Sequence, residues 1–180
     1  MLEHFPQRWF TDKDGDQILM TNLCRRVAIP KEFKDNAALY MAYSIKDGES
    51  ARDIAARLYD DPDLFWVIYM VNDIHDIMSQ WPIQSQQLQE QLIKKYGLEG
   101  LDEISHYTDP NGLITDIHAM KLRHGDMSMT TADVVSYYSL KAHTVESNEH
   151  SINDMKRSIK LIDPDHTSRF KAQIEEILNE

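Results

Sequence analysis

The stretch of residues 43–74 constrains the fold of this chain more than any other part of the sequence. Tyr43 and Ile45 alternate with polar residues, as in a strand with one buried face. Ser50 and Asp53 then have the spacing of a capping box, a pair of side chains that satisfies free backbone N–H groups at a helix start. The stretch is therefore predicted to begin as a strand and to pass through a tight turn into a helix.

A second helix start follows at Asp61-Pro62. The aspartate can accept a backbone N–H at the cap, and the proline ring fixes a φ angle that suits the first helical turn. Beyond it, apolar side chains recur at helical spacing, at Leu64, Phe65, Ile68 and Val71. The sequence thus predicts a strand followed by two short helices, with a second strand close to Trp81.

This order resembles the LysM fold, a βααβ module known for binding N-acetylglucosamine polymers such as peptidoglycan and chitin. The residues that carry the resemblance are Tyr43, Ile45, Gly48, Glu49, Ser50, Ile54, Ala55, Tyr59, Pro62, Trp66, Val67, Ile68, Asn72 and Ile74. In sugar-binding members the groove lies between the first strand-to-helix turn and the loop after the second helix. The resemblance therefore implies groove candidates at Gly48, Glu49, Ser50, Asn72, Asp73 and Ile74.

Each of these groove candidates also has a structural alternative. Gly48 can make the turn, Ser50 can cap the first helix, and Asn72 can end the second helix with its own side chain. Most other residues in the resemblance fill a core or fix a turn, and a fold does not by itself establish a function. The sequence is therefore compatible with a sugar groove and with a purely structural use of the same residues.

Segments on both sides of the module extend the resemblance to one family. They are Met20-Thr21-Asn22-Leu23 with Arg25-Arg26, Trp81-Pro82 with Ser85 and Lys95-Tyr96-Gly97, and the run from Asn153 to Lys160 before Asp163-Pro164. In this order they are similar to the LysM-containing baseplate wedge subunits of contractile-tailed, T-even-like bacteriophages. The resemblance implies a structural protein of the virion tail baseplate, assembled in the host cytoplasm. It also implies six copies per baseplate that join neighbouring wedge and hub-proximal proteins around the central hub.

The expected fold class is α+β, with the LysM-like module at residues 43–83. Residues 1–42 lack sustained periodicity and predict an irregular N-terminal arm with one short strand around Ile18 to Met20. Residues 84–118 predict a packing helix and then a β-hairpin that turns at Asp109-Pro110-Asn111-Gly112. In that helix Ser85 is the expected cap, and Gly97 is placed to end it in the left-handed conformation.

Residues 119–180 are interpreted as a C-terminal docking region. An alternating run around Val134 to Leu140 favours a strand. Asp163-Pro164 starts a helix that carries Phe170, Ile174, Ile177 and Leu178 on one face. Because little chain remains to cover it, this amphipathic helix is expected to dock onto a partner.

Composition narrows the classes of partner. The 180 residues carry a formal net charge of −11, whereas nucleic-acid binding needs clustered Lys and Arg to neutralise phosphates. Cys24 is the single cysteine, which excludes an intramolecular disulfide and fits a reducing compartment. The beginning of the chain has no signal-peptide pattern, and no apolar run reaches the length of a membrane span. Neither nucleic acid nor membrane is therefore an expected partner.

The chemical motifs favour a protein that is not an enzyme and holds no metal or cofactor. Residues 12–16 resemble the start of a calcium loop, but Gln17 stands where that loop needs glycine and Leu23 where it needs glutamate. The eight histidines are scattered, without a helical HxxxH pair or a Cys/His cluster. No GxSxG motif, P-loop or dinucleotide fingerprint occurs, so neither nucleophilic hydrolysis nor phosphate chemistry has a local signature.

Partner contacts are expected at aromatic and basic residues and on the terminal helix. Trp9 would be costly to leave exposed in an irregular arm, and tryptophan, as at Trp81, is enriched in interface hot spots. Tyr137 and Tyr138 would place their rings on opposite faces of a strand. The full set of candidates is Trp9, Trp81, Tyr137, Lys156, Arg157, Phe170 and Ile174.

The sequence thus predicts a structural wedge protein that connects neighbouring baseplate subunits. The main alternative is a LysM-type module that binds peptidoglycan or chitin. A peptidoglycan hydrolase is disfavoured, because residues 1–42 and 84–180 contain no recognisable catalytic set. The basic run from Lys156 to Lys160 and the terminal helix favour the connector, since a sugar-binding module needs neither.

Overall fold

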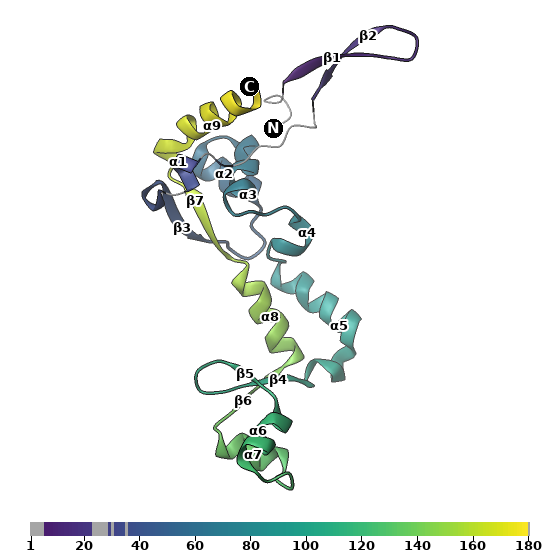
Figure 1. Ribbon diagram of the computed structural model, residues 1–180, viewed down its shortest axis with the longest axis vertical. Coiled ribbons are helices and arrows are strands. Elements are labelled where there is room, and N and C mark those ends of the chain that lie inside the picture. Colours follow the sequence, from purple (N-terminus) through teal and green to yellow (C-terminus); the bar gives the residue numbers. More distant parts are fainter. Residues whose placement is uncertain (1–5, 23–28, 30, 35, 180) are drawn as a thin grey trace. The chain divides into compact units, whose positions relative to one another are not determined.

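The computed structural model describes residues 6–22, 29, 31–34 and 36–179, and the chain divides into two compact units. Unit 1 contains the chain up to Pro82 and again from Lys156 onward, whereas unit 2 is the intervening segment Ile83–Met155. Figure 1 shows the helices and strands of both units. The family resemblance at Leu23, Arg25 and Arg26, and the interpretation of Cys24, lie outside the described residues.

Unit 1 is built on two antiparallel strands that lie far apart in the sequence. Strand β3 (Tyr40–Ser44) pairs with β7 (Ser158–Ile162), so that Tyr43 faces Ile159, and Figure 1 shows the two strands side by side. The expectation of a second strand close to Trp81 is wrong, because the chain there forms α4 (Ile77–Gln80) and then an irregular segment. The partner strand comes only after unit 2.

The first two helices after β3 begin where the sequence predicted. Helix α2 (Ala51–Tyr59) has the capping box, in which Ser50 Oγ accepts the Asp53 amide at 3.2 Å and Asp53 Oδ2 accepts the Ser50 amide at 3.0 Å. Asp61 Oδ1 accepts the Asp63 amide at 2.9 Å and starts the 3-10 turn η3 (Pro62–Leu64), which continues into α3 (Phe65–Val71). The prediction of a strand and two capped helices is confirmed.

The core of unit 1 collects apolar side chains from both of its chain segments. Phe33 of α1 (Lys31–Lys34) and Phe170 of α9 (Pro164–Asn179) are fully buried, and their rings meet edge to face with centroids 4.9 Å apart. The other large, fully buried side chains of this core are Ile45, Ile54, Val67, Ile68, Leu161, Ile162 and Ile174. Leu39, in the 3-10 turn η2 (Ala37–Leu39), joins the same core.

The N-terminal arm contains a β-hairpin where the sequence predicted one short strand. Strand β1 (Gln7–Thr11) pairs antiparallel with β2 (Gln17–Thr21), with Phe10 opposite Ile18. The predicted strand around Ile18 to Met20 is confirmed as β2. The prediction that the rest of the arm is irregular is wrong for Gln7–Thr11, which forms β1. The pattern misled because Trp9 and Phe10 are adjacent, whereas a strand with one buried face alternates apolar and polar residues.

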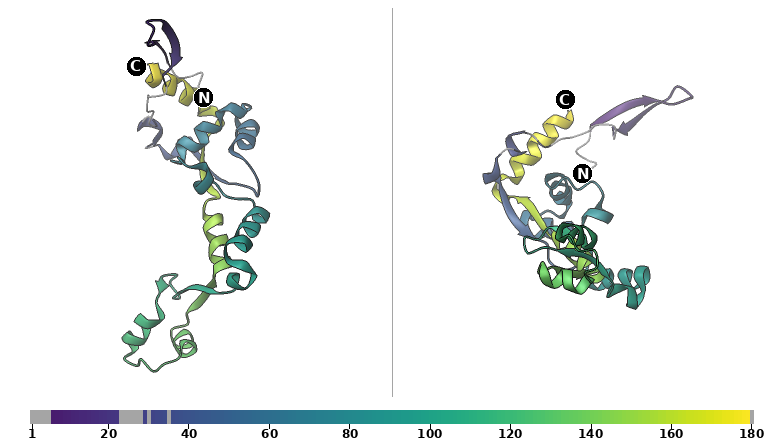
Figure 2. Two further views of the ribbon diagram at one scale, coloured as in Figure 1. Left: turned by 90° about the vertical axis from the view of Figure 1, so that its right-hand side faces the viewer. Right: turned by 60° about the horizontal axis from the view of Figure 1, so that its bottom comes forward.

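Unit 2 combines two packed helices with a three-stranded sheet. Helix α5 (Ser85–Leu101) packs on α8 (Val145–Met155), as Figure 2 shows. The sheet has the strand order β5-β4-β6, formed by β5 (Ile114–Thr115), β4 (Ile104–Thr108) and β6 (Lys141–Thr144). The predicted hairpin is confirmed, since β4 and β5 pair around a turn that Asp109 closes by accepting the amides of Asn111 and Leu113, each at 2.9 Å.

Three predictions of local structure in unit 2 need correction. The run from Val134 to Leu140 is not a strand: most of it lies in α7 (Thr131–Tyr137), because Thr130 and Asp133 form a second capping box. Helix α5 begins after Gln84 without a side-chain cap, so Ser85 is its first residue and not its cap. Gly97 does adopt a positive φ of 72°, but its ψ of 170° makes a kink and the helix resumes to Leu101. Helix α6 (Ile117–His124), which precedes α7, ends at Gly125 in the left-handed conformation.

Candidate functional site

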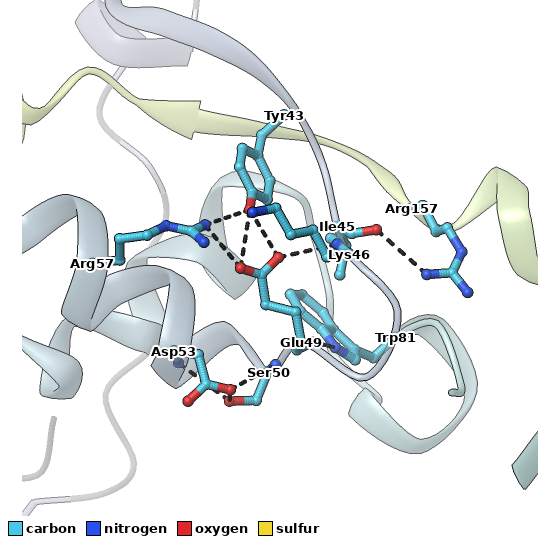
Figure 3. A network of polar contacts seen from close by, with 9 residues as sticks. All are labelled: Tyr43, Ile45, Lys46, Glu49, Ser50, Asp53, Arg57, Trp81 and Arg157. Atoms are coloured by element: carbon cyan, nitrogen blue, oxygen red, sulfur yellow. Dashed lines mark hydrogen bonds and ion pairs between the residues drawn. The ribbon is translucent and has the colours of Figure 1, made fainter. Parts of the chain in front are cut away.

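The groove candidates on one side lie in the turn between β3 and α2, where Glu49 is the most densely bonded residue. Its carboxylate accepts the Tyr43 hydroxyl at 2.8 and 3.0 Å and the Lys46 amide at 3.0 Å, and it pairs with Arg57 at 2.8 Å (Figure 3). The Arg57 guanidinium also donates to the Tyr43 hydroxyl. Only 9% of the Glu49 side chain is exposed, so this carboxylate faces its own chain.

Burial alone would raise the pKa of Glu49. The Lys46 amide, the Tyr43 hydroxyl and the Arg57 guanidinium outweigh that effect and lower the pKa below its ordinary value. Glu49 therefore remains an anion whose hydrogen-bonding capacity is already used inside the module. The sequence had singled out Glu49 as a groove candidate, Tyr43 only as a strand residue that carries the resemblance, and Arg57 not at all. The contact of these three side chains depends on how β3 packs against α2, which the sequence does not show.

Gly48 and Ser50 have the structural roles that the sequence allowed. Gly48 has a φ of 74°, in the left-handed region that a residue with a Cβ rarely adopts. Ser50 Oγ lies 2.6 Å from Asp53 Oδ2 in addition to the two capping bonds. Both residues thus shape the turn that presents Glu49.

The groove candidates on the other side end α3 and attach it to the second strand. Asn72 Nδ2 donates to the carbonyls of Ile68 at 2.8 Å and Lys160 at 2.7 Å, while its Oδ1 accepts the Lys160 amide at 2.8 Å. Asp73 has a φ of 52°, and the Ile74 amide donates to the Tyr69 carbonyl at 2.9 Å. The Asn72 side chain is therefore engaged in joining α3 to β7.

Trp81 lies against the β3–α2 turn and is buried, with 9% of its surface exposed. Its indole N–H donates to the Glu49 carbonyl at 3.1 Å (Figure 3), and its ring meets Tyr69 edge to face at 5.4 Å. Trp81 thus connects the end of α4 to the turn that carries half of the groove candidates. That position gives it a structural function within unit 1 and leaves little of its ring for a partner.

The basic candidates are only partly available at the surface. Arg157 pairs with Asp47 at 2.7 Å and donates to the Ile45 carbonyl at 3.4 Å, so it fastens the start of β7 to the β3–α2 turn. Lys156 is half-buried, whereas Lys160 exposes its side chain at the middle of β7. The run from Lys156 to Lys160 is therefore largely a strand of unit 1.

The remaining interface candidates separate into buried and exposed residues. Phe170 and Ile174 are fully buried in the core of unit 1, so this part of the apolar face of α9 is covered by the same chain, whereas Ile177 is half-buried. The expectation of a face left open for docking is wrong for Phe170 and Ile174, because the discontinuous unit supplies its own cover; the Leu178 side chain lies outside the described residues. Trp9 and Tyr137 are exposed. The Tyr137 and Tyr138 rings meet edge to face at 4.9 Å and so do not lie on opposite faces of a strand.

The described part of the chain contains neither a metal-binding cluster nor a helix that could span a membrane. No group of three or more His, Cys, Asp or Glu is arranged there to hold a metal ion. Asp12 instead uses its carboxylate to accept the amides of Asp14 and Asp16, at 2.9 and 3.0 Å. Among the same residues, no helix has the length and apolar character needed to cross a bilayer.

Comparison with known proteins identifies the family. The sequence profile of phage base plate wedge protein 53 matches residues 8–117, more than half of the chain. The chain is also 30% identical over 103 residues to baseplate wedge protein gp53 of Enterobacteria phage T4, a match covering 56% of this chain and 52% of that relative. The match thus spans about half the length of the curated relative. This chain therefore belongs to the base plate wedge protein 53 family of T-even-like phages, a family of proteins of the virion tail baseplate.

Proposed function

We propose that this chain is a non-catalytic structural subunit that connects neighbouring wedge subunits around the baseplate hub, in six copies. The observation that carries the proposal is the family match, which starts in the N-terminal hairpin and ends in unit 2. Each unit also has its own buried cluster of apolar side chains. One chain thereby offers two separately folded bodies, which is what a connector between two neighbours requires.

We further propose that β3, α2, α3 and β7 form a LysM-like module used for protein contact. The order of these elements and the antiparallel pairing of β3 with β7 support it. Unit 2 would then be a large insertion between the second helix and the second strand of the module. A fold resemblance of this kind supports an architecture and leaves the function to the site residues.

Sugar binding by the same module is the second candidate, because Gly48 and Asn72 stand in the order that a LysM groove requires. The contacts of the groove candidates count against it. Glu49 is saturated by Tyr43, Lys46 and Arg57, and Asn72 by Ile68 and Lys160. A sugar hydroxyl would have to displace these hydrogen bonds. Breaking hydrogen bonds to a part-buried carboxylate costs more free energy than a new hydrogen bond at an exposed position contributes.

Calorimetric titration of the full chain with N-acetylglucosamine oligomers separates the two candidates. The connector proposal expects no saturable heat from a folded sample. Saturable binding that is lost in Ser50→Ala would support the sugar groove; Lys160→Ala, which keeps the backbone bonds to Asn72, is the matched control. Such binding would overturn the exclusive assignment to protein contact.

Assembly of baseplates tests the connector itself. Wedges are prepared from cells infected with a phage that does not produce this protein, and they are mixed with the purified protein. The products are separated by sedimentation and viewed by electron microscopy. The proposal expects closed rings only when the protein is added, with six copies in each. Rings that close equally well without it would contradict a connecting role.

A further inference from the structure

The hairpin β1–β2 exposes apolar side chains on both of its faces. Trp9, Phe10, Ile18, Leu19 and Met20 are each between 45% and 64% exposed. Nine of the ten strand positions are exposed, and Thr21 is half-buried. Such a distribution differs from that of a strand pair that faces water on one side, where apolar and polar residues alternate.

The register assigns these side chains to two opposite faces. Trp9 pairs with Leu19, and the next pair along the ladder is Phe10 with Ile18. Because successive side chains of a strand point to opposite faces, the two pairs point away from each other. Met20 lies on the face of Phe10 and Ile18, where these three line a hollow of about 420 Å³.

Covering both faces would provide the stability that this hairpin lacks by itself. A two-stranded hairpin is marginal in water, because it has no second layer against which to bury side chains. Burying large apolar side chains stabilises such a hairpin, and here these side chains are divided between the two faces. A flat surface would bury only one set, so the complementary shape is a slot with two walls.

The tip of the hairpin is acidic and internally fixed. Residues 12–16 contain three aspartates and one lysine. The Asp12 carboxylate accepts two amides of the turn, the Asp12 amide donates to the Asp16 carbonyl at 2.9 Å, and Gly15 has a φ of 90°. Asp14 and Asp16 are exposed at this end. The tip therefore presents negative charge on a compact turn.

We propose that the β1–β2 hairpin inserts into an apolar slot of a different baseplate protein, with its acidic tip against Lys and Arg residues of that protein. A second copy of this chain is a poor occupant, because each copy carries a net charge of −11. An anionic membrane would repel the tip and cover one face alone. This proposal rests on the proposed function, because that function makes the partner a baseplate protein. The family match includes the hairpin, since it begins within β1, at residue 8.

Photo-crosslinking of the full chain tests whether both faces are covered. A photoreactive phenylalanine analogue replaces Thr11, which lies on the face of Trp9, or Arg8, which lies on the face of Phe10. Each labelled protein is added to wedges prepared without this chain, and incorporation is measured by sedimentation before irradiation. The expected result is cross-links from both positions to peptides of the same partner protein.

Other outcomes overturn either this proposal or the one before it. Cross-links from one position only would indicate a flat interface, and cross-links to another copy of this chain would indicate self-association; either overturns the slot. A chain that incorporates without any cross-link from the hairpin overturns it as well. A chain that does not incorporate at all overturns the proposed connector, and with it the hairpin's assignment to a baseplate neighbour.

Variants at the two faces and the tip give a second readout. Trp9→Ser and Ile18→Ser, on opposite faces, should each weaken binding to the wedges more than ten-fold, whereas Gln17→Ser should leave it unchanged. Emission from Trp66 and Trp81 reports that unit 1 remains folded in Ile18→Ser. Asp14→Asn with Asp16→Asn should slow association and reduce its dependence on salt, while Asp12 is kept because it holds the turn. Loss of binding in only one of the two face variants, or an unchanged salt dependence, would contradict the proposal.

Discussion

The side-chain amide of Asn72 hydrogen-bonds both backbone groups of Lys160, with Oδ1 accepting the amide at 2.8 Å and Nδ2 donating to the carbonyl at 2.7 Å. In an antiparallel ladder, the N–H and C=O of one residue point to the same side of the strand. Lys160 directs both toward Asn72 and hence away from its partner Ala42. Asn72 therefore satisfies the outer edge of β7 and fixes the strand that returns from unit 2.

Removal of that amide should destabilise unit 1 selectively. Asn72→Ala leaves two backbone groups of β7 and the Ile68 carbonyl without this partner, and we expect a loss of about 2 kcal/mol in the free energy of unfolding. All three tryptophans lie outside residues 83–155, so their emission during urea unfolding reports unit 1. A change of less than about 0.5 kcal/mol would show that water replaces the amide at no cost.

Lys160→Ala is the matched control for the Asn72 variant. The bonds involve the backbone of residue 160, and its own side chain is exposed. The variant should therefore change the unfolding free energy by no more than about 0.5 kcal/mol, as for surface substitutions in general. A loss as large as that of Asn72→Ala would assign a role to the lysine side chain.

Features that depend on neighbours in the sequence were predictable. Capping at Ser50, the start at Asp61-Pro62, the turn after Thr108 and the start of α9 each need only three or four consecutive residues. The second capping box, at Thr130 and Asp133, carries the same signal but was outweighed by the apparent alternation of the residues that follow.

Features that depend on distant pairing were not predictable. Asn72 was predicted to end a helix, and it does. The hydrogen bonds of its side-chain amide to Lys160, however, join residues 88 positions apart and have no local signal. Because β7 completes the sheet of unit 1, the run before Asp163 looked like a free basic segment and α9 like an uncovered helix. Knowledge of the β3–β7 pairing would have reassigned both.

The charge of Glu49 should make unit 1 sensitive to acid. Hydrogen bonds and the Arg57 charge, which outweigh burial, lower the pKa of Glu49 below its ordinary value of 4.5. A carboxyl with a lowered pKa in the folded state contributes stability above its unfolded pKa, and loses it as the pH falls through its folded pKa. We expect the tryptophan-detected stability of wild type to fall below pH 4.5 more steeply than that of Glu49→Gln.

Glu49→Gln should also be less stable than wild type at neutral pH, by about 1–3 kcal/mol, since it weakens the bonds from Tyr43, Lys46 and Arg57. Glu99→Gln, which changes an exposed carboxylate in unit 2, serves as the control for net charge. Parallel acid curves for wild type and Glu49→Gln would show that other carboxyl groups set the acid limit.

Trp81 should contribute to unit 1 through both its ring and its N–H group. Trp81→Phe keeps an aromatic ring against Tyr69 but loses the donor to the Glu49 carbonyl, so it should cost about 1–2 kcal/mol. Trp81→Ala also leaves a cavity and should cost about 3–5 kcal/mol. Unfolding followed by circular dichroism and by Trp66 emission measures both losses; equal stability of the two variants would mean that the ring contributes nothing beyond its N–H.

Unit 2 should lose stability on mild acidification through His143. This ring stacks on His106 with centroids 4.8 Å apart and planes 5° apart, and its Nε2 lies 3.0 Å from Thr108 Oγ1. Burial first, and then the charges of His106 and Lys141, lower the pKa of His143 below its ordinary value of 6.5.

A lowered histidine pKa fixes the sign of that effect. Well above pH 6.5 the ring is neutral in both the folded and the unfolded states, so it contributes no pH dependence there. As the pH falls through 6.5, the unfolded state takes up a proton that the folded state resists, and stability declines until the folded pKa is passed. Unit 2 contains no tryptophan, so its thermal unfolding is the circular-dichroism transition that tryptophan emission does not report. As the pH is lowered from 7.5 to 5.5, this transition should therefore move to lower temperature. His143→Gln keeps a polar group near Thr108 that does not titrate, so it should lessen this shift of the unfolding temperature. The control is His118→Gln, which replaces an exposed histidine and should leave the shift unchanged. An undiminished shift in His143→Gln would place the titrating group elsewhere.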